Sequence, residues 1–185
     1  MEAGLTIRPA TADDAPALAE IYGDGVLHGV GTFEESPPDA EEMARRREAV
    51  VARGLPYLVA ELDGRVAGYA YASPFRPRTG YRYTAETSIY VAPWAKRRGV
   101  GAALLGPVVA ACERLGLRQL MAVVGGSENL ASIALHRAFG FEVQGVMPAV
   151  GFKFGRWIDI VIMQRPLNQG ADSPPDGPGL PLGGG

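Results

Sequence analysis

Residues 83–105, YTAETSIYVAPWAKRRGVGAALL, combine three structural signals in one uninterrupted stretch. The run from Arg82 to Val91 has the alternating side-chain pattern that is typical of a strand. Pro93 and a basic cluster follow, and from Gly99 to Leu115 the apolar residues recur with the period of a helix. A strand that passes through a short loop into an amphipathic helix indicates an α/β chain, because each element must bury its apolar face against another.

The rest of the chain continues this alternation of strand-like and helix-like segments. Asp63-Gly64 is a strong signal for a two-residue hairpin turn, so part of the sheet is expected to be antiparallel. The sequence predicts an α/β domain with a mixed central sheet of about seven strands, flanked by about four helices. The expected strands are 5–9, 57–62, 66–72, 82–91, 119–124, 141–150 and 154–165, and the expected helices are 11–28, one that opens at 36–39, 99–115 and 129–139.

Local signals define several of the helix ends. Thr11 and Asp14 have the spacing of a capping box, and Pro37 is expected at the first position of the second helix. Gly140 fits the left-handed position just after a helix. Pro107 lies in the middle of the 99–115 helix, where it removes one backbone hydrogen bond and is expected to introduce a kink.

The composition is that of a globular chain with one main domain. Of its 185 residues, 47% are hydrophobic and 21% are charged, and the formal net charge is −2. A charge this close to zero does not attract a protein to nucleic acid or to an anionic membrane. We therefore expect neither as a partner, and any basic function must be local.

Metal and disulfide sites are not expected from the residues available. Cys112 is the only cysteine, and His28 and His136 are the only histidines. No spacing among them matches a metal site, so no metal is predicted. The N-terminal MEAGLTIRPA has no basic and apolar signal pattern, and no apolar run is long enough for a membrane span. These features predict a cytoplasmic protein.

The C-terminal residues differ sharply from the rest. Residues 168–185 read NQGADSPPDGPGLPLGGG, in which ten of eighteen are Pro or Gly. Such a segment contains too few apolar residues to offset its chain entropy by its own burial. The sequence therefore predicts a domain over residues 1–167 and a disordered tail over residues 168–185.

The segment RRGVGA at the start of the 99–115 helix has the features of an anion site. The first four amides of a helix have no intrahelical partner, and the positive end of the helix dipole favours phosphate. Glycines at 99 and 101 allow a ligand to approach the backbone, and a basic cluster precedes them. Neither a Walker loop nor a three-glycine dinucleotide fingerprint matches the spacing. A turn softened by glycine, with solvated basic residues, is the alternative.

Glu86 is the carboxylate that stands out on the preceding strand. Alternation places it on one face with Thr84, Ser88 and Tyr90, roughly 13 Å along the strand from Tyr90, which lies just before the anion loop. A long cofactor with its phosphates at that loop would therefore have its other end near Glu86. The alternative is a strand carboxylate that faces water or pairs with Arg82.

Several separated motifs resemble the GCN5-related N-acetyltransferases (GNAT). They are the strand, basic loop and Gly-x-Gly helix start at 82–105, and the later NLASIALHRAFGF. TAETSIYV, FRPR and GFKFGRWIDIVIMQ look like the phosphinothricin N-acetyltransferase branch, and the likeness runs from Ile7 to about Leu167. Lys96, at a position where the family usually has Gln or Arg, Pro107 and the tail are departures from this pattern.

The resemblance implies a fold, a reaction and a set of residues. The fold is the GNAT fold, and the reaction transfers an acetyl group directly from acetyl-CoA to the α-amine of a small glutamate-like amino acid, such as phosphinothricin or methionine sulfoximine. Glu86 would be the general base, acting directly or through water, and His136 would take the place of a tyrosine that protonates the thiolate. The residues implied for acetyl-CoA are Tyr90, Val91, Lys96, Arg97, Arg98, Gly99, Val100, Gly101, Ala102, Asn129 and Ser132.

The acceptor residues are also assigned by the resemblance. Arg76 and Arg78 match a basic pair that faces the anionic groups of the substrate, and guanidinium groups suit carboxylates and phosphinates. Phe33, Tyr81 and Lys153 would form pocket walls. Each has a structural alternative: the arginines can be solvated, the aromatic residues can be core, and His136 can be a hydrogen-bonded structural residue.

Other functions stay open at this point. The same fold can acetylate a protein N-terminus, a polyamine or an aminoglycoside, although cationic acceptors would prefer an acidic pocket over one with Arg76 and Arg78. A non-catalytic sensor of coenzyme A is a further alternative, which the presence of Glu86 disfavours.

The resemblance also implies a homodimer.

Overall fold

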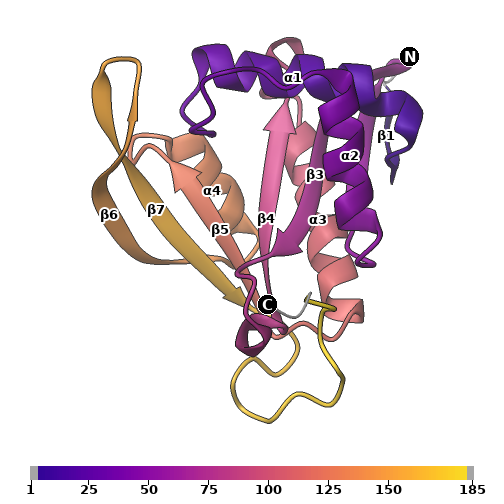
Figure 1. Cartoon of the computed structure of the whole chain (residues 1–185), viewed down its shortest axis with the longest axis vertical. Coiled ribbons are helices and arrows are strands. Elements are labelled where there is room, and N and C mark those ends of the chain that lie inside the picture. Colours follow the sequence, from indigo (N-terminus) through magenta and orange to yellow (C-terminus); the bar gives the residue numbers. More distant parts are fainter. Residues whose placement is uncertain (1–3, 183–185) are drawn as a thin grey trace.

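The computed structural model describes residues 4–182 and consists of one mixed sheet with helices on both faces (Figure 1). The seven strands lie in the order β1-β2-β3-β4-β5-β7-β6. Their bounds are β1 Leu5–Pro9, β2 Tyr57–Leu62, β3 Arg65–Pro74, β4 Thr84–Val91, β5 Gln119–Gly125, β6 Glu142–Lys153 and β7 Arg156–Pro166. This architecture confirms the predicted fold class.

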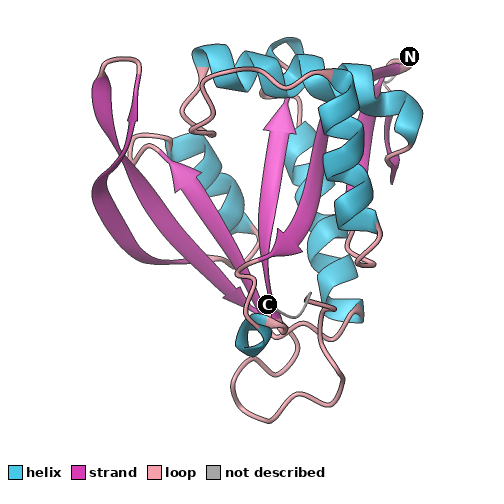
Figure 2. Ribbon diagram, in the orientation of Figure 1, coloured by secondary structure: helices cyan, strands magenta, loops and turns pink. Residues whose placement is uncertain are grey.

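Four α-helices cover the sheet: α1 Ala15–His28, α2 Ala40–Val51, α3 Val100–Arg114 and α4 Leu130–Ala138. Helices α1 and α2 lie in front of the sheet, and α3 and α4 lie behind it (Figure 2). Two glycines of α3 allow α3 and α4 to approach each other closely. Gly101 lies beside Leu135 of α4, and Gly106 lies beside Phe139, the residue after the end of α4. Among the described residues, no helix combines the length and the apolar character needed to cross a membrane.

The sheet opens between its two central strands. Strands β4 and β5 form the one parallel pair among the described strands, and they pair only from Thr84↔Gln119 to Thr87↔Ala122. Beyond Thr87, β4 stays paired with β3 as far as Val91, and β5 stays paired with β7 as far as Gly125. Each strand is therefore held by its outer neighbour, and a gap opens between them.

The local sequence signals are confirmed where they were strongest. Asp63 and Gly64 have positive φ angles of 55° and 79° in the β2–β3 hairpin. The capping box of Thr11 and Asp14 is present before α1, and Gly140 has a φ of 79° after α4. Each of these features depends on a few consecutive residues, which explains why the sequence alone predicts them.

The start of the second helix differs from expectation. The second helix begins at Ala40, and Asp39 is its N-cap, accepting a 2.8 Å hydrogen bond from the amide of Glu42. Pro37 therefore precedes the helix, because the carboxylate of Asp39 is the better cap. Helix α3 agrees with the predicted 99–115 helix, since it runs from Val100 to Arg114 with Pro107 inside it.

The segment predicted as a tail has a described path over residues 168–182. Residues 168–182 follow a defined path against the domain, and Leu180 is only 6% exposed. The tail has few apolar residues of its own, but the domain offers hydrogen-bond donors to its carbonyl groups, which are described below.

Candidate active site

A cavity of about 580 Å³ occupies the gap between β4 and β5. Its walls come from the separated halves of the two strands, from the start of α3 and from one face of α4. Apart from Arg98, all of the residues predicted to contact acetyl-CoA line this cavity: Tyr90, Val91, Lys96, Arg97, Gly99, Val100, Gly101, Ala102, Asn129 and Ser132. The splayed strands thus create the space that the sequence pattern required.

The N-terminus of α3 forms the basic end of the cavity. Arg97 and Gly99 have positive φ angles of 62° and 78°, so the loop turns its backbone towards the first turn of the helix. Amides of that turn lack intrahelical partners and carry the positive end of the helix dipole. Gly101 lies 3.1 Å from Leu135 and 4.0 Å from Val91, measured from an ideal Cβ. A ligand with negatively charged phosphates fits this end.

Arg98 is the exception among the predicted cofactor residues. It does not line the cavity, and its guanidinium lies 3.7 Å from the carboxylate of Asp63 in the β2–β3 hairpin. Both side chains are largely exposed, so this ion pair contributes little stability. The structure therefore separates Arg98 from the other basic residues of the loop.

Strand β4 presents two free backbone amides to the cavity. The amide of Ala92 donates to Ala67 on the β3 side, at 2.9 Å. Because successive amides of a strand point in opposite directions, those of Val91 and Ile89 point towards the gap, whereas that of Tyr90 points to β3. Tyr90 and Val91 are among the predicted acetyl-CoA residues. Of their two amides, only that of Val91 faces the cavity, and Ile89 was not predicted.

Glu86 lies immediately before the stretch of β4 that lines the cavity. It is half-buried, opposite Ser73 of β3 on one side and Met121 of β5 on the other. Burial raises the pKa of the Glu86 carboxyl above its ordinary value, and the positive charge of Arg76 acts in the opposite direction. A carboxylate in this setting is a stronger proton acceptor than an exposed one, which suits a general base.

The loop between β3 and β4 carries three of the predicted acceptor residues. The guanidinium carbon of Arg76 lies 4.4 Å from the ring centroid of Phe75, and Tyr81 packs edge to face against the same ring at 5.8 Å. Arg78 is exposed and precedes the short helix Thr79–Tyr81. These residues do not line the large cavity, but Arg76 is close enough to influence Glu86 electrostatically.

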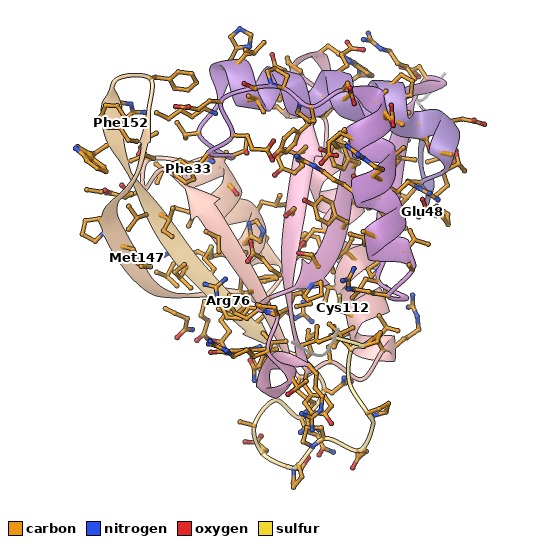
Figure 3. All side chains as sticks on the ribbon, viewed as in Figure 1. Phe33, Glu48, Arg76, Cys112, Met147 and Phe152 are labelled. Carbon is orange, nitrogen blue, oxygen red and sulfur yellow. The ribbon has the colours of Figure 1, made fainter. Side chains whose placement is uncertain are left out.

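Phe33, labelled in Figure 3, and Lys153 join the loop after α1 to the β6–β7 hairpin. The ring of Phe33 lies directly against Gly151, where any Cβ would collide with it. The ammonium of Lys153 donates to the carbonyls of Gly29 and Thr32, at 2.9 and 2.8 Å. Because Lys153 is only 3% exposed and already bonded, its contacts indicate a structural role, which differs from the pocket wall that the resemblance implied.

His136 lines the cavity from α4 and is almost fully buried. Its Nδ1 donates to the carbonyl of Ser132 at 2.8 Å, and its Nε2 has no partner among the described residues. Burial lowers the pKa of His136, so the ring is neutral and Nε2 carries no proton. In this form Nε2 accepts a hydrogen bond and cannot donate one.

Several cavity residues escaped the sequence analysis. Gly31 and the β5 residues from Ala122 to Gly125 form the wall opposite β4. An ideal Cβ on Gly125 would overlap the carbonyl oxygen of Val30, so only glycine allows the loop after α1 to cross the end of β5. The pair Gly125-Gly126 is a visible signal of such a close approach, but the sequence does not show what approaches.

Cys112 does not line this cavity. Cys112 is fully buried in α3, and burial raises the pKa of its thiol to about 12, so it is a poor nucleophile. Within residues 4–182, no group of three or more His, Cys, Asp or Glu side chains is arranged to hold a metal ion.

Comparisons with known proteins agree with this geometry. The acetyltransferase (GNAT) domain family matches residues 7–162. A phosphinothricin N-acetyltransferase of Alcaligenes faecalis is 53% identical over 171 residues, which cover 92% of this chain and 87% of the relative. An L-methionine sulfoximine/L-methionine sulfone acetyltransferase of Salmonella typhimurium is 40% identical, covering 90% and 97%.

A solved structure shares the whole architecture. It is that of a GNAT superfamily phosphinothricin acetyltransferase from Sinorhizobium meliloti in complex with AcCoA, with a TM-score of 0.91, 49% identity and 97% of each chain covered. These similarities confirm the predicted enzyme class, an N-acetyltransferase that uses acetyl-CoA as cosubstrate. The chain belongs to the GNAT family of acetyltransferases.

Proposed function

We propose that the protein acetylates the α-amine of a small glutamate-like amino acid, such as phosphinothricin or methionine sulfoximine, with Glu86 as the general base. The observation that carries this proposal is the position of Glu86. Its half-buried carboxyl, with a raised pKa, immediately precedes the β4 residues that line the cavity. The named activities of the relatives from Alcaligenes faecalis and Salmonella typhimurium support the acceptor class.

Each part of the site has a task in this reaction. The first-turn amides of α3 with Lys96 and Arg97 hold the diphosphate, and the inward amide of Val91 stabilises the developing oxyanion. Glu86 removes a proton from the substrate ammonium, directly or through water, which frees the lone pair of the nitrogen for attack on the thioester carbon. The N–C bond forms, the C–S bond breaks, and the thiolate leaves and takes up a proton.

For His136 we propose a contact role near the sulfur end of the cosubstrate. The resemblance implied proton donation to the thiolate, but the bond to the Ser132 carbonyl leaves Nε2 as an acceptor. Because burial also lowers its pKa, the ring lacks the second proton that an acid would need at neutral pH. Solvent is then the proton source for the thiolate.

Arg76 and Arg78 are assigned to the anionic groups of the acceptor. Replacing Arg78 by Ala should raise the KM for phosphinothricin by about 10-fold to 100-fold, the worth of one hydrogen bond to a charged group. The KM for acetyl-CoA should stay unchanged. The measurement is thiol release from acetyl-CoA over a panel of amino acids, sulfoximines, polyamines and aminoglycosides.

The matched control for this experiment is Arg137→Ala, at an exposed position of α4. Acetylation of polyamines in preference to amino acids by the unaltered enzyme would reject the acceptor class. An equal rise of both KM values in Arg78→Ala would reject the substrate contact while leaving the reaction class intact.

We also propose that the enzyme is a homodimer that pairs through the β6–β7 hairpin. Large apolar side chains of this hairpin are exposed by 39–64%, including Met147 and Phe152 in Figure 3. Exposed large apolar side chains that gather on one hairpin are typical of protein–protein interaction sites. The members of this apolar surface are Val143, Val146, Met147, Val150, Phe152, Phe154 and Trp157.

Replacing Val146 by Asp should convert the dimer into a monomer, because a charge would have to be buried in the contact. Light scattering coupled to size exclusion measures the mass directly. Leu115→Asp is the control, since Leu115 is similarly exposed but lies at the end of α3. A monomeric unaltered protein, or a Val146→Asp variant that is still dimeric, would contradict this interface.

A further inference from the structure

The C-terminal residues 168–182 form a strap beneath the sheet. In Figure 1 this segment, coloured yellow, loops below the lower end of the sheet and returns to the start of β4. It begins at Asn168, whose side-chain amide donates to the carbonyls of Glu113 and Leu117, at 3.1 and 2.9 Å. The described part ends just after Leu180, which is buried. We call residues 168–182 the C-terminal strap.

Arg118 holds the middle of the strap. Its guanidinium donates to the carbonyls of Gly170, Ser173 and Pro174, at 2.9, 2.7 and 3.3 Å, and to the hydroxyl of Ser173 at 2.9 Å. Arg118 is only 7% exposed. A buried cation needs hydrogen-bond acceptors, and here the strap supplies them, so the strap and the domain depend on each other.

The far end of the strap contacts Arg82 and Tyr83. The amide of Leu180 donates to the carbonyl of Arg82 at 2.7 Å, and the hydroxyl of Tyr83 donates to the carbonyl of Gly177 at 2.6 Å. Gly179, with a φ of 75°, fits so closely that an ideal Cβ would lie 2.7 Å from Cγ and 2.8 Å from the carbonyl oxygen of Arg82. The strap therefore fixes the backbone at Arg82.

Arg82 joins the strap to the candidate acceptor loop, residues 75–81. Its amide and its guanidinium both donate to the carbonyl of Thr79, at 3.1 and 3.0 Å. On its other side, Arg82 leads into β4, where Glu86 lies four residues later. Any movement of the strap at Leu180 is thus transmitted both to the loop that carries Arg76 and Arg78 and to the start of the strand that carries the base.

We propose that the C-terminal strap is a positioning segment for the acceptor, and that its contact with Arg82 holds the acceptor loop in the conformation that binds substrate. This inference rests on the proposed function, since it takes Arg76 and Arg78 as acceptor contacts. When the strap is released, the loop occupies its binding conformation for only a fraction of the time. The apparent affinity for the acceptor then falls by that fraction.

Two glycines of the strap offer a matched test. Gly179→Ala places a Cβ against Arg82 in a left-handed conformation that alanine disfavours, so it should displace the strap. Gly177→Ala meets nothing within 4 Å and keeps the carbonyl that Tyr83 contacts. Tyr83→Phe removes only the hydroxyl bond to the strap and serves as a second, milder variant.

We expect Gly179→Ala to raise the KM for the amino-acid acceptor by about fivefold to tenfold. Tyr83→Phe should act in the same direction with a smaller effect, and Gly177→Ala should match the unaltered enzyme. The dissociation constant for acetyl-CoA, measured by calorimetry, should be unchanged in all three. The amides of Tyr81 and Arg82 donate hydrogen bonds to carbonyls of the acceptor loop. Hydrogen exchange at these two amides should accelerate in Gly179→Ala and Tyr83→Phe, and it should be unchanged in Gly177→Ala.

A purely structural strap would lower the melting temperature of Gly179→Ala without changing the ratio of the two KM values, and that result would overturn the proposal. Unchanged exchange at Tyr81 and Arg82 would overturn it as well. Failure of the proposed function looks different, because the unaltered enzyme itself would then not acetylate the amino-acid panel.

Discussion

Replacing Glu86 by Gln should lower kcat by about 10²-fold to 10⁴-fold, the usual contribution of a general base. Gln keeps the size of the side chain and its position opposite Ser73 and Met121, so packing around β4 is preserved. The amide cannot accept the proton of the substrate ammonium. Acetyl-CoA binding should stay unchanged, because Glu86 is not among the residues that line the cavity.

The pH dependence gives a second readout of the same variant. A general base works only when it is deprotonated, so kcat/KM should fall as the pH drops through the pKa of Glu86. Burial raises that pKa above the ordinary value of 4.5, which places the loss of activity at a higher pH than for an exposed glutamate. In Glu86→Gln this acidic limb should disappear from the profile.

The control for both measurements is Glu48→Gln, which removes one carboxylate from the outer face of α2 (Figure 3). It should match the unaltered enzyme in rate and in pH profile. Turnover of Glu86→Gln within a factor of a few of the unaltered enzyme would remove Glu86 as the base and leave the amine to lose its proton to solvent.

The sequence predicted the parts of the fold that depend on neighbouring residues. The Asp63-Gly64 turn, the capping box of Thr11 and Asp14 and the left-handed Gly140 are set by a few consecutive residues, and the structure contains all of them. The cavity is different. It exists because β4 and β5 part after Thr87 while each stays paired with its outer neighbour, and a strand's own sequence does not specify where its partner leaves.

The acceptor side of the site shows the same limit. The position of Lys153 in the chain is compatible with a pocket wall, yet its ammonium bonds to Gly29 and Thr32, more than 120 residues away. The family resemblance assigned a role by alignment of motifs, whereas the burial of one cation between two carbonyls depends on how a hairpin and a loop meet. Arg98 likewise belongs to the basic run that includes Lys96 and Arg97, but its side chain points away from the cavity and pairs with Asp63.

Replacing Gly101 by Asp should weaken acetyl-CoA binding by about 100-fold, which corresponds to roughly 2.7 kcal/mol. The new carboxylate would lie in the first turn of α3, where it repels the diphosphate and competes for the same amides. Loss of one or two hydrogen bonds between backbone amides and charged phosphate oxygens is sufficient for this magnitude. Calorimetric titration of coenzyme A into the purified variant measures the effect.

The control for Gly101→Asp is Pro107→Asp, which adds the same charge at an exposed position of the same helix, about 9 Å further along its axis. S-acetylpantetheine, which has no diphosphate, provides the decisive comparison. Provided that Leu135 makes room for the new side chain, only the phosphate end is altered, and the Gly101→Asp variant should use this short donor as well as the unaltered enzyme does. Equal losses with both donors would mean that the introduced side chain acts through its contacts with Leu135 and Val91, and would contradict a loss confined to the diphosphate.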